Sequence, residues 1–290
     1  MVKLAFSGGG MRAIAYIGAL RALDEKHVTN IDEVIGSSAG CIYAVACACK
    51  VNIWEIKRFM KSIDYSSLVD DSFLIVDIYH LYNNYGWCRG DKLLKLFETI
   101  LEKFTGNKDI TFKELYDKTN IKLIITATNM RDKKTNYFSV DTEPNMMVKI
   151  AMRASTAIQF FFEPVMYNNV FYNDGGLLDN YPIKYIMRNN TDQIIGFKLL
   201  ASNELIIDDE IGIKPQDIRN VKDYAMAIIQ MIFNKIDQDD IDATTLNKTV
   251  LISTYNISSI DFKLNKQKMK RLIDSGYRST MKYLERNKNI

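Results

Sequence analysis

The chain has 290 residues, of which 47% are hydrophobic and 25% are charged, which is the composition of an ordinary globular protein. Its net charge of +3 is too small to indicate a nucleic-acid-binding protein, but it is compatible with weak attraction to a membrane surface. No apolar run is long enough to span a bilayer, and no signal peptide precedes the first expected strand. We therefore expect a protein that is cytoplasmic or peripheral to a membrane, with four free cysteines that form no Cys-x-x-Cys pair.

The first elements form a strand, a glycine loop and a helix. Residues 2–6 are apolar enough for a short buried strand, and residues 13–23 carry apolar side chains at helical spacing. Between them, residues 7–12 read Ser-Gly-Gly-Gly-Met-Arg. Consecutive glycines at the start of a helix expose backbone N–H groups, so this loop is a candidate anion-binding site.

Three interpretations of the glycine loop stay open at this point. The loop is an oxyanion hole that faces a nucleophile further along the chain, a dinucleotide-binding loop, or a structural turn. A dinucleotide site needs an acidic residue at the end of the second strand. Asp32 and Glu33 lie near that distance, but they precede the second apolar run instead of following it.

The second motif is centred on Ser38. An apolar pair at residues 34–35 leads into Gly36-Ser37-Ser38-Ala39-Gly40, and a run of small apolar residues follows. This order of strand, sharp turn and helix is typical of a nucleophile elbow, in which side chains in place of Gly36 and Gly40 would crowd the turn. A plain turn between a strand and a helix is the alternative.

The remaining elements alternate between helices and strands, with an irregular aromatic stretch at residues 64–88. This alternation favours one α/β domain over residues 1–290, with a motif-bearing core at 1–200 and a C-terminal part at 201–290. A capping box at Thr111 and Glu114 predicts the start of one helix. Helices are expected at 52–60, 92–104, 111–116, 148–157, 221–236 and 266–286, and strands at 121–128, 135–140, 193–200 and 249–254, with a hairpin-like segment at 165–176.

The chemistry of Ser38 depends on a base, because a serine hydroxyl is a weak nucleophile by itself. The chain has two histidines, His27 and His80, and neither follows the acidic Asp174-Gly175-Gly176 turn. The order of serine, acid and histidine that is found in α/β-hydrolases is therefore absent. If Ser38 is the nucleophile, a carboxylate has to act as its base directly.

Together these motifs resemble the patatin-like phospholipase family, which uses a Ser-Asp dyad without histidine. The glycine loop at residues 8–12, the elbow at 36–40, the segment Arg153-Ala154-Ser155-Thr156-Ala157 and the Asp-Gly-Gly turn at 174–176 match the family blocks in order. Two positions depart from the family pattern: Ala13 replaces a usual glycine, and Ile158-Gln159 replaces a usual Ala-Pro.

The resemblance implies a three-layer α/β/α fold with a mostly parallel central sheet and a serine carboxylic-ester hydrolase that needs no metal or cofactor. It implies Ser38 as nucleophile and Asp174 as general base, with Gly175 and Gly176 completing the acidic motif. It also implies an oxyanion hole at Gly8, Gly9 and Gly10, in which N–H groups of the last two hold the oxyanion. Arg12 either orients this loop, contacts a lipid phosphate, or is a surface charge at the start of the helix.

The expected partner is a phospholipid or another acyl-ester lipid, with contact to a membrane surface and without nucleic acid. The leading hypothesis is a phospholipase of the A type. A transacylase with the same dyad and a lipid-binding protein without turnover on the same fold are the alternatives.

Overall fold

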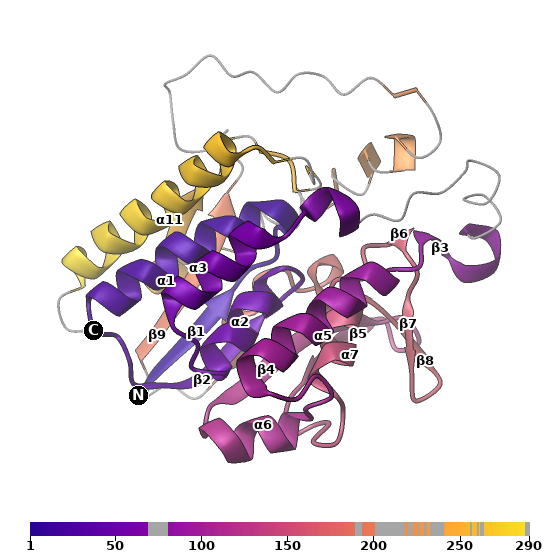
Figure 1. The fold of residues 1–290 in the computed structure, drawn as a ribbon, viewed down its shortest axis with the longest axis horizontal. Coiled ribbons are helices and arrows are strands. Elements are labelled where there is room, and N and C mark those ends of the chain that lie inside the picture. Colours follow the sequence, from indigo (N-terminus) through magenta and orange to yellow (C-terminus); the bar gives the residue numbers. More distant parts are fainter. Residues whose placement is uncertain are drawn as a thin grey trace.

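The computed structural model describes residues 1–68, 81–188, 193–200, 218–219, 223–225, 227–228, 231–232, 241–255, 257–259, 261 and 264–287 (Figure 1). Its centre is an eight-stranded sheet with the order β10-β9-β1-β2-β4-β8-β7, in which β5 pairs with β4. The first five strands of this order pair in parallel, and β5, β7 and β8 are antiparallel. This confirms the predicted, mostly parallel sheet. The strands are β1 (Val2–Phe6), β2 (Ile31–Gly36), β4 (Lys122–Asn129), β5 (Lys134–Phe138), β7 (Val165–Tyr167), β8 (Val170–Asp174), β9 (Gln193–Leu200) and β10 (Thr249–Ser253).

Alternating side chains of the central strands enter two separate apolar clusters. In β1, Leu4 and Phe6 belong to the main core, whereas Ala5 belongs to a smaller cluster on the other face. The same alternation separates Val34 from Ile35 in β2, as expected when successive side chains point to opposite faces. Helices thus cover both faces of the sheet, which confirms the α/β/α fold class.

Most helices cover the main core, and α8 covers the smaller cluster. They are α1 (Tyr16–Glu25), α2 (Gly40–Ala48), α3 (Ile53–Ser62), α5 (Asp91–Thr105), α6 (Phe112–Thr119), α7 (Val148–Ser155), α8 (Ile183–Ile186), α10 (Ala243–Leu246) and α11 (Lys266–Arg286). Within the described ranges, no helix is both long enough and apolar enough to cross a bilayer.

The helix boundaries follow local sequence signals closely, with one difference. The predicted capping box is present, since the Thr111 side chain accepts from the Glu114 N–H and the Glu114 side chain accepts from the Thr111 N–H. The helix expected from residue 13 begins instead as a 3-10 helix, η1 (Gly10–Ala15), before α1. A 3-10 turn is common at the start of an α-helix, and here it follows Gly10, whose φ is +53°.

The C-terminal part of the chain joins the same sheet and the same helical layer. Strand β10 extends the sheet beside β9, and α11 lies against α1 at a very small separation (Figure 1). A Cβ added at Gly18 would lie 1.8 Å from the Ile273 carbonyl oxygen, and one at Gly276 would lie 2.0 Å from that of Ala15. These glycines let the two helices touch. Most of the helix predicted at 221–236 lies outside the described residues.

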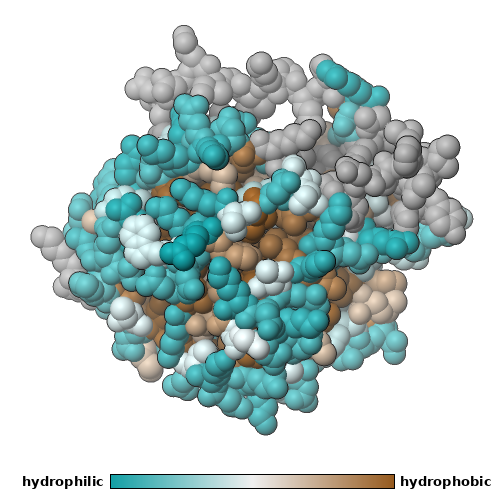
Figure 2. All heavy atoms as spheres, in the orientation of Figure 1, coloured by the Kyte–Doolittle hydropathy of each residue, from teal (hydrophilic) through white to brown (hydrophobic). Residues whose placement is uncertain are grey.

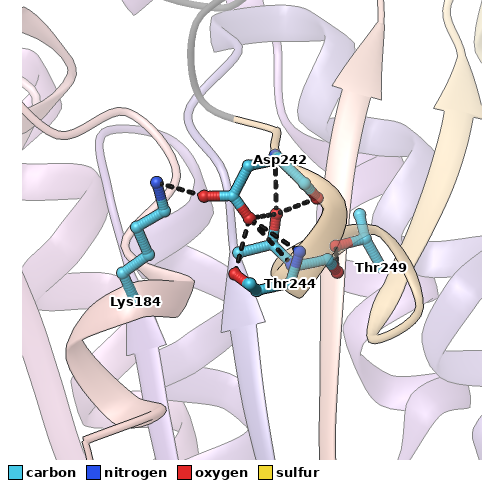
Figure 3. A network of polar contacts seen from close by, with 5 residues as sticks. Lys184, Asp242, Thr244 and Thr249 are labelled. Carbon is cyan, nitrogen blue, oxygen red and sulfur yellow. Dashed lines mark hydrogen bonds and ion pairs between the residues drawn. The ribbon is translucent and has the colours of Figure 1, made fainter.

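A polar network joins α8 to the segment before β10 (Figure 3). Asp242 caps α10 by accepting the N–H groups of Thr244 and Thr245, and its other carboxylate oxygen lies 2.7 Å from Lys184 Nζ. Thr249 donates to the Thr245 carbonyl at 2.7 Å. The network ties the C-terminal part to the helix that follows the Asp-Gly-Gly turn.

The aromatic stretch contains two short elements on either side of residues that the structure does not describe. A 3-10 helix, η2 (Tyr65–Leu68), precedes residues 69–80, and β3 (Gly86–Cys88) follows them. Strand β3 pairs in parallel with β6 (Phe160–Phe162) in a separate two-stranded sheet. Parts of the stretch thus have regular structure, although no periodic pattern indicated it.

Candidate active site

Ser38 lies on a tight, left-handed turn between β2 and α2. Its φ is +49°, which is unusual for a residue with a Cβ and is typical of the strained turn of a nucleophile elbow. A Cβ at Gly36 would lie 2.7 Å from the Cys41 Cα, and one at Gly40 would lie 2.6 Å from the Ser7 carbonyl oxygen. Glycine at both positions lets the turn fold back against β1 and the start of α2.

The end of β8 brings Asp174 to Ser38 across 136 residues of sequence. The Ser38 hydroxyl donates to Asp174 Oδ2 at 2.7 Å, which is a short, well-formed hydrogen bond. Asp174 is fully buried, whereas Ser38 is 8% exposed. The serine is therefore the member of the pair that a substrate can reach.

Local hydrogen bonds fix Asp174 in place. Its second carboxylate oxygen, Oδ1, accepts the Gly176 N–H at 2.7 Å, and its carbonyl accepts the Thr128 hydroxyl at 2.8 Å. Burial raises the pKa of Asp174 from its ordinary value of 3.8 to about 7, although the hydrogen bonds from Ser38 and Gly176 act in the opposite direction. A carboxyl with a pKa near neutrality is well matched to accept and return a proton.

The glycine loop presents two backbone N–H groups beside Ser38. The Gly8 N–H donates to the Asn180 carbonyl at 2.9 Å, so Gly8 shapes the loop. Among the residues that the structure describes, no acceptor engages the N–H of Gly9 or Gly10. Gly10 has a left-handed φ, and a Cβ there would lie 2.1 Å from the Ser259 carbonyl oxygen. This position therefore requires glycine for two independent reasons.

Arg12 lies under the glycine loop and is 6% exposed, so it is not a surface charge. Its Nε donates to the Gly9 carbonyl at 3.3 Å, which supports the role of orienting the loop. A small cavity of about 30 Å³ is lined by Gly9, Gly10, Arg12, Ser38, Asp174 and Asn180, among others. This volume accommodates about one water molecule, so it suits an ester oxygen better than a whole head group.

An apolar pocket lies on the other side of Ser38. Its walls come from η1, α2, α3, η2, α5 and β6, and Figure 2 shows brown atoms gathered between α3 and α5, above α2. Tyr65 of the aromatic stretch is among the residues that line it. Its lining includes Ile14, Ile42, Met60, Leu93, Phe97 and Phe162.

Two residues at the site were not identified as such from the sequence. Ser155, at the end of α7, accepts the Ser38 N–H with its hydroxyl at 2.9 Å. The N–H of Ala39, at the start of α2, has no acceptor within the described ranges, and it follows the serine directly. The family resemblance singled out the Arg153-Ala154-Ser155 block that contains Ser155, but nothing in the pattern of this block indicated a contact with the elbow.

The structure also shows where the residues lie that a catalytic histidine or a dinucleotide-binding site would require. His27 is exposed and precedes β2, whereas Ser38 follows β2, so the strand separates them by roughly 20 Å. His80 lies outside the described residues. Glu33 forms a 2.8 Å ion pair with Lys3 in the paired strands, which is not the position of a ribose-binding acid. Within the described ranges, no cluster of His, Cys, Asp or Glu could hold a metal ion.

Comparison with known proteins gives consistent results at the level of family and fold. A probable lipid hydrolase of Invertebrate iridescent virus 6 is 33% identical over 69% of the chain and 70% of that protein. An uncharacterized protein of Acanthamoeba polyphaga mimivirus is 30% identical over 96% of the chain and 91% of that protein. The crystal structure of VipD from Legionella pneumophila superposes with a TM-score of 0.66 at 19% identity, covering 98% of the chain and 66% of VipD.

A family model described as patatin-like phospholipase matches residues 4–187. The matched segment includes the glycine loop, the elbow, the Arg153 block and the Asp-Gly-Gly turn, and it ends directly after α8. The chain belongs to the patatin-like phospholipase family.

Proposed function

We propose that the protein hydrolyses fatty-acyl esters of phospholipids, as a phospholipase of the A type, through an acyl-enzyme on Ser38 with Asp174 as general base. The family supports lipid acyl hydrolysis as the class of activity. The observation that carries the proposal is the 2.7 Å hydrogen bond from the Ser38 hydroxyl to a fully buried carboxyl whose pKa is raised to about 7.

In the first step, Ser38 Oγ attacks the ester carbonyl while its proton moves to Asp174 Oδ2. The Gly176 N–H and the buried β8 backbone keep Asp174 from rotating during this transfer. The carbonyl oxygen becomes negative, and the N–H groups of Gly9, Gly10 and Ala39 are the donors available to it. Such preorganised donors typically contribute a large part of the rate acceleration.

In the second step, the tetrahedral intermediate collapses and the leaving alcohol takes the proton from Asp174. Water then attacks the acyl-enzyme while the same carboxylate accepts its proton. As the bond from the acyl group to Ser38 Oγ breaks, Asp174 returns this proton to Oγ, and the fatty acid leaves. The apolar pocket beside Ser38 suits the acyl chain, because burial of methylene groups against Ile42, Leu93 and Phe97 removes apolar surface from water. We also propose that residues 1–290 act as one domain, since β10 and α11 extend the sheet and the helical layer of the motif-bearing part.

The test uses the full chain, a fluorophosphonate probe and mixed phospholipid vesicles. Wild type should react with the probe and release free fatty acid, whereas Ser38→Ala should do neither while keeping its melting temperature. His27→Ala is the matched control, because it changes a candidate base at the far end of β2. Transfer of the acyl group to an added alcohol in place of water would identify a transacylase, and binding of lipid without turnover would contradict the proposal.

A further inference from the structure

Four large apolar side chains are exposed at the edge of the molecule where β3, β6, β7 and β8 lie (Figure 1). Met166 and Phe171 lie directly opposite each other in the β7–β8 pair, and the Phe171 ring packs edge-on against Tyr85 at 5.7 Å between centroids. Tyr85 precedes Gly86, which pairs with Phe160. The exposed fractions of Tyr85, Phe160, Met166 and Phe171, here called the apolar patch, are 57%, 54%, 56% and 37%.

Two of these exposed aromatic residues have unfavourable backbone conformations. Tyr85 has a φ of +64° and Phe160 a φ of +63°. The left-handed region is costly for bulky residues, and glycine would remove the cost at both positions. Strain of this kind persists mainly where a function depends on it, and what these two residues share is an exposed aromatic ring.

The apolar patch is close in sequence to residues that line the candidate active site. Ile158 lines both the apolar pocket and the small cavity beside Ser38, and Phe162 lines the apolar pocket. Phe160 lies between them in sequence and turns outward. Phe171 lies three residues before Asp174 in β8, a distance of roughly 10 Å along the strand. A lipid that leaves a bilayer under the patch therefore has a short path to Ser38.

A basic turn borders the apolar patch. The turn between β4 and β5 carries Arg131 and Lys133, and β5 begins with Lys134. With the single acid Asp132, residues 131–134 have three positive charges minus one, or +2. Arg131 donates a hydrogen bond to the Asn169 carbonyl at the tip of the β7–β8 hairpin. Phe171 accepts the N–H of the neighbouring Met130. Exposed aromatic and apolar side chains beside basic residues are the composition that binds the interface of an anionic membrane.

We propose that the apolar patch and the basic turn at residues 131–134 form the docking surface of this protein for an anionic lipid bilayer. The proposal rests on the proposed lipid hydrolysis, because the docked bilayer supplies the substrate. Insertion of the patch places the mouth of the apolar pocket at the membrane surface, and the basic turn selects bilayers that contain acidic lipids.

The experiment measures co-sedimentation of full-length Ser38→Ala with vesicles of phosphatidylcholine, with and without phosphatidylserine. With the patch residues unchanged, the Ser38→Ala protein should bind the vesicles. Phosphatidylserine should strengthen this binding, and salt should weaken it. Phe171→Ser and, as an independent edge-strand variant, Met166→Ser should each weaken binding about tenfold, as expected when one inserted apolar side chain is lost. Lys133→Glu should remove the preference for phosphatidylserine. Trp54→Ser is the matched control, since Trp54 is 51% exposed on α3, away from β7 and β8 (Figure 1).

Activity assays separate this proposal from the proposed function. With active enzyme, Phe171→Ser should lose hydrolysis of vesicles while hydrolysis of a short soluble ester stays at the wild-type rate. Vesicle binding through the patch without any ester hydrolysis would leave docking intact and contradict the enzymatic proposal. Vesicle binding by folded Phe171→Ser and Met166→Ser at the level of Trp54→Ser would overturn the docking proposal. A dimer in solution that Phe171→Ser dissociates would also overturn it, because the patch would then join two copies of the chain.

Discussion

Asp174 and Asp242 form the same local motif and have opposite electrostatics. Each aspartate caps a short helix: Asp174 accepts the N–H two residues ahead, and Asp242 accepts those two and three residues ahead. Each also accepts a nearby hydroxyl. Asp174 is fully buried, and desolvation raises its pKa to about 7. Asp242 is exposed at the surface, and the hydrogen bond from Lys184 is the main cause that lowers its pKa.

The comparison shows that a cap does not determine the chemistry of the capping carboxylate. Short-range hydrogen bonds position both side chains, and they favour the charged form in both. The difference comes from burial, because the low-dielectric interior penalises the charged form of Asp174 whereas water solvates Asp242. The buried carboxylate is a candidate base, and the exposed one is a structural connection between α8 and α10.

The largest expected effect separates these two carboxylates directly. Asp174→Asn keeps a cap for Gly176 but cannot accept the Ser38 proton, so kcat/KM on a soluble ester should fall about 1,000-fold or more. Asp242→Asn should leave kcat/KM unchanged. Because the proposed mechanism makes Ser38 and Asp174 act as a unit, the Ser38→Ala/Asp174→Asn double variant should be hardly worse than either single variant. A folded Asp174→Asn that keeps more than about a tenth of wild-type activity would refute the base assignment.

The next effect concerns the glycine loop, whose backbone N–H groups are the proposed donors to the oxyanion beside Asp174. Gly10→Ala should lower kcat about 100-fold or more, since its Cβ meets the Ser259 backbone and the φ of +53° is unfavourable for alanine. Gly9→Ala is the matched control. Its Cβ meets only the end of the Leu199 side chain, at 2.5 Å, which can move. We expect kcat to decrease less in Gly9→Ala, with KM nearly constant in both variants.

Equal turnover per active site by folded Gly10→Ala and wild type would contradict the oxyanion role of this loop. Melting temperatures are measured beside the rates, so that a loss of folded protein is not mistaken for a loss of turnover. Titration of active sites with the fluorophosphonate gives the number of competent molecules in each preparation.

The pKa of Asp174 predicts a pH dependence of moderate size. Asp174 accepts the proton of Ser38 only when ionised, so kcat/KM should rise about tenfold per pH unit below pH 7 and level off above it. Because the folded pKa lies above the ordinary 3.8, this group's contribution to stability is complete at low pH and is lost as pH rises through about 7. Asp174→Asn should abolish this pH dependence of stability, which thermal unfolding between pH 4 and pH 8 would measure.

The smallest expected effect belongs to the exposed carboxylate. Asp242→Ala removes a helix cap and an ion pair with Lys184, so the melting temperature should fall by a few degrees without a change in turnover. Asp242→Asn retains a capping oxygen and should recover most of this loss. A large fall in kcat/KM for either variant would show that the C-terminal network acts on the site and would break the contrast with Asp174.

Much of the fold could be predicted because it depends on neighbours in sequence. Short apolar runs predicted the five strands of the parallel part of the sheet, although for β2 the run marked only residues 34–35 of Ile31–Gly36. Thr111 with Glu114 predicted the start of α6. The glycines of the elbow indicated a tight turn at Ser38, since only a chain without a Cβ at Gly36 and Gly40 passes so close to other backbone. The exception, η1, lies where a left-handed Gly10 precedes the helix and the periodicity of the side chains gives no boundary.

The candidate site depended on contacts that no local pattern contains. The sequence by itself determined which residues form the glycine loop, the elbow and the acidic turn, since each is defined by fewer than six neighbouring positions. Only the tertiary structure decided that Ser38 meets Asp174 at 2.7 Å, that Ser155 takes the Ser38 N–H, and that the N–H groups of Gly9 and Gly10 lack an acceptor in the described part of the chain. The physical reason is that desolvation and hydrogen-bond competition are set by atoms from distant elements, and these two effects decide the pKa of Asp174 and the direction of every donor at the site.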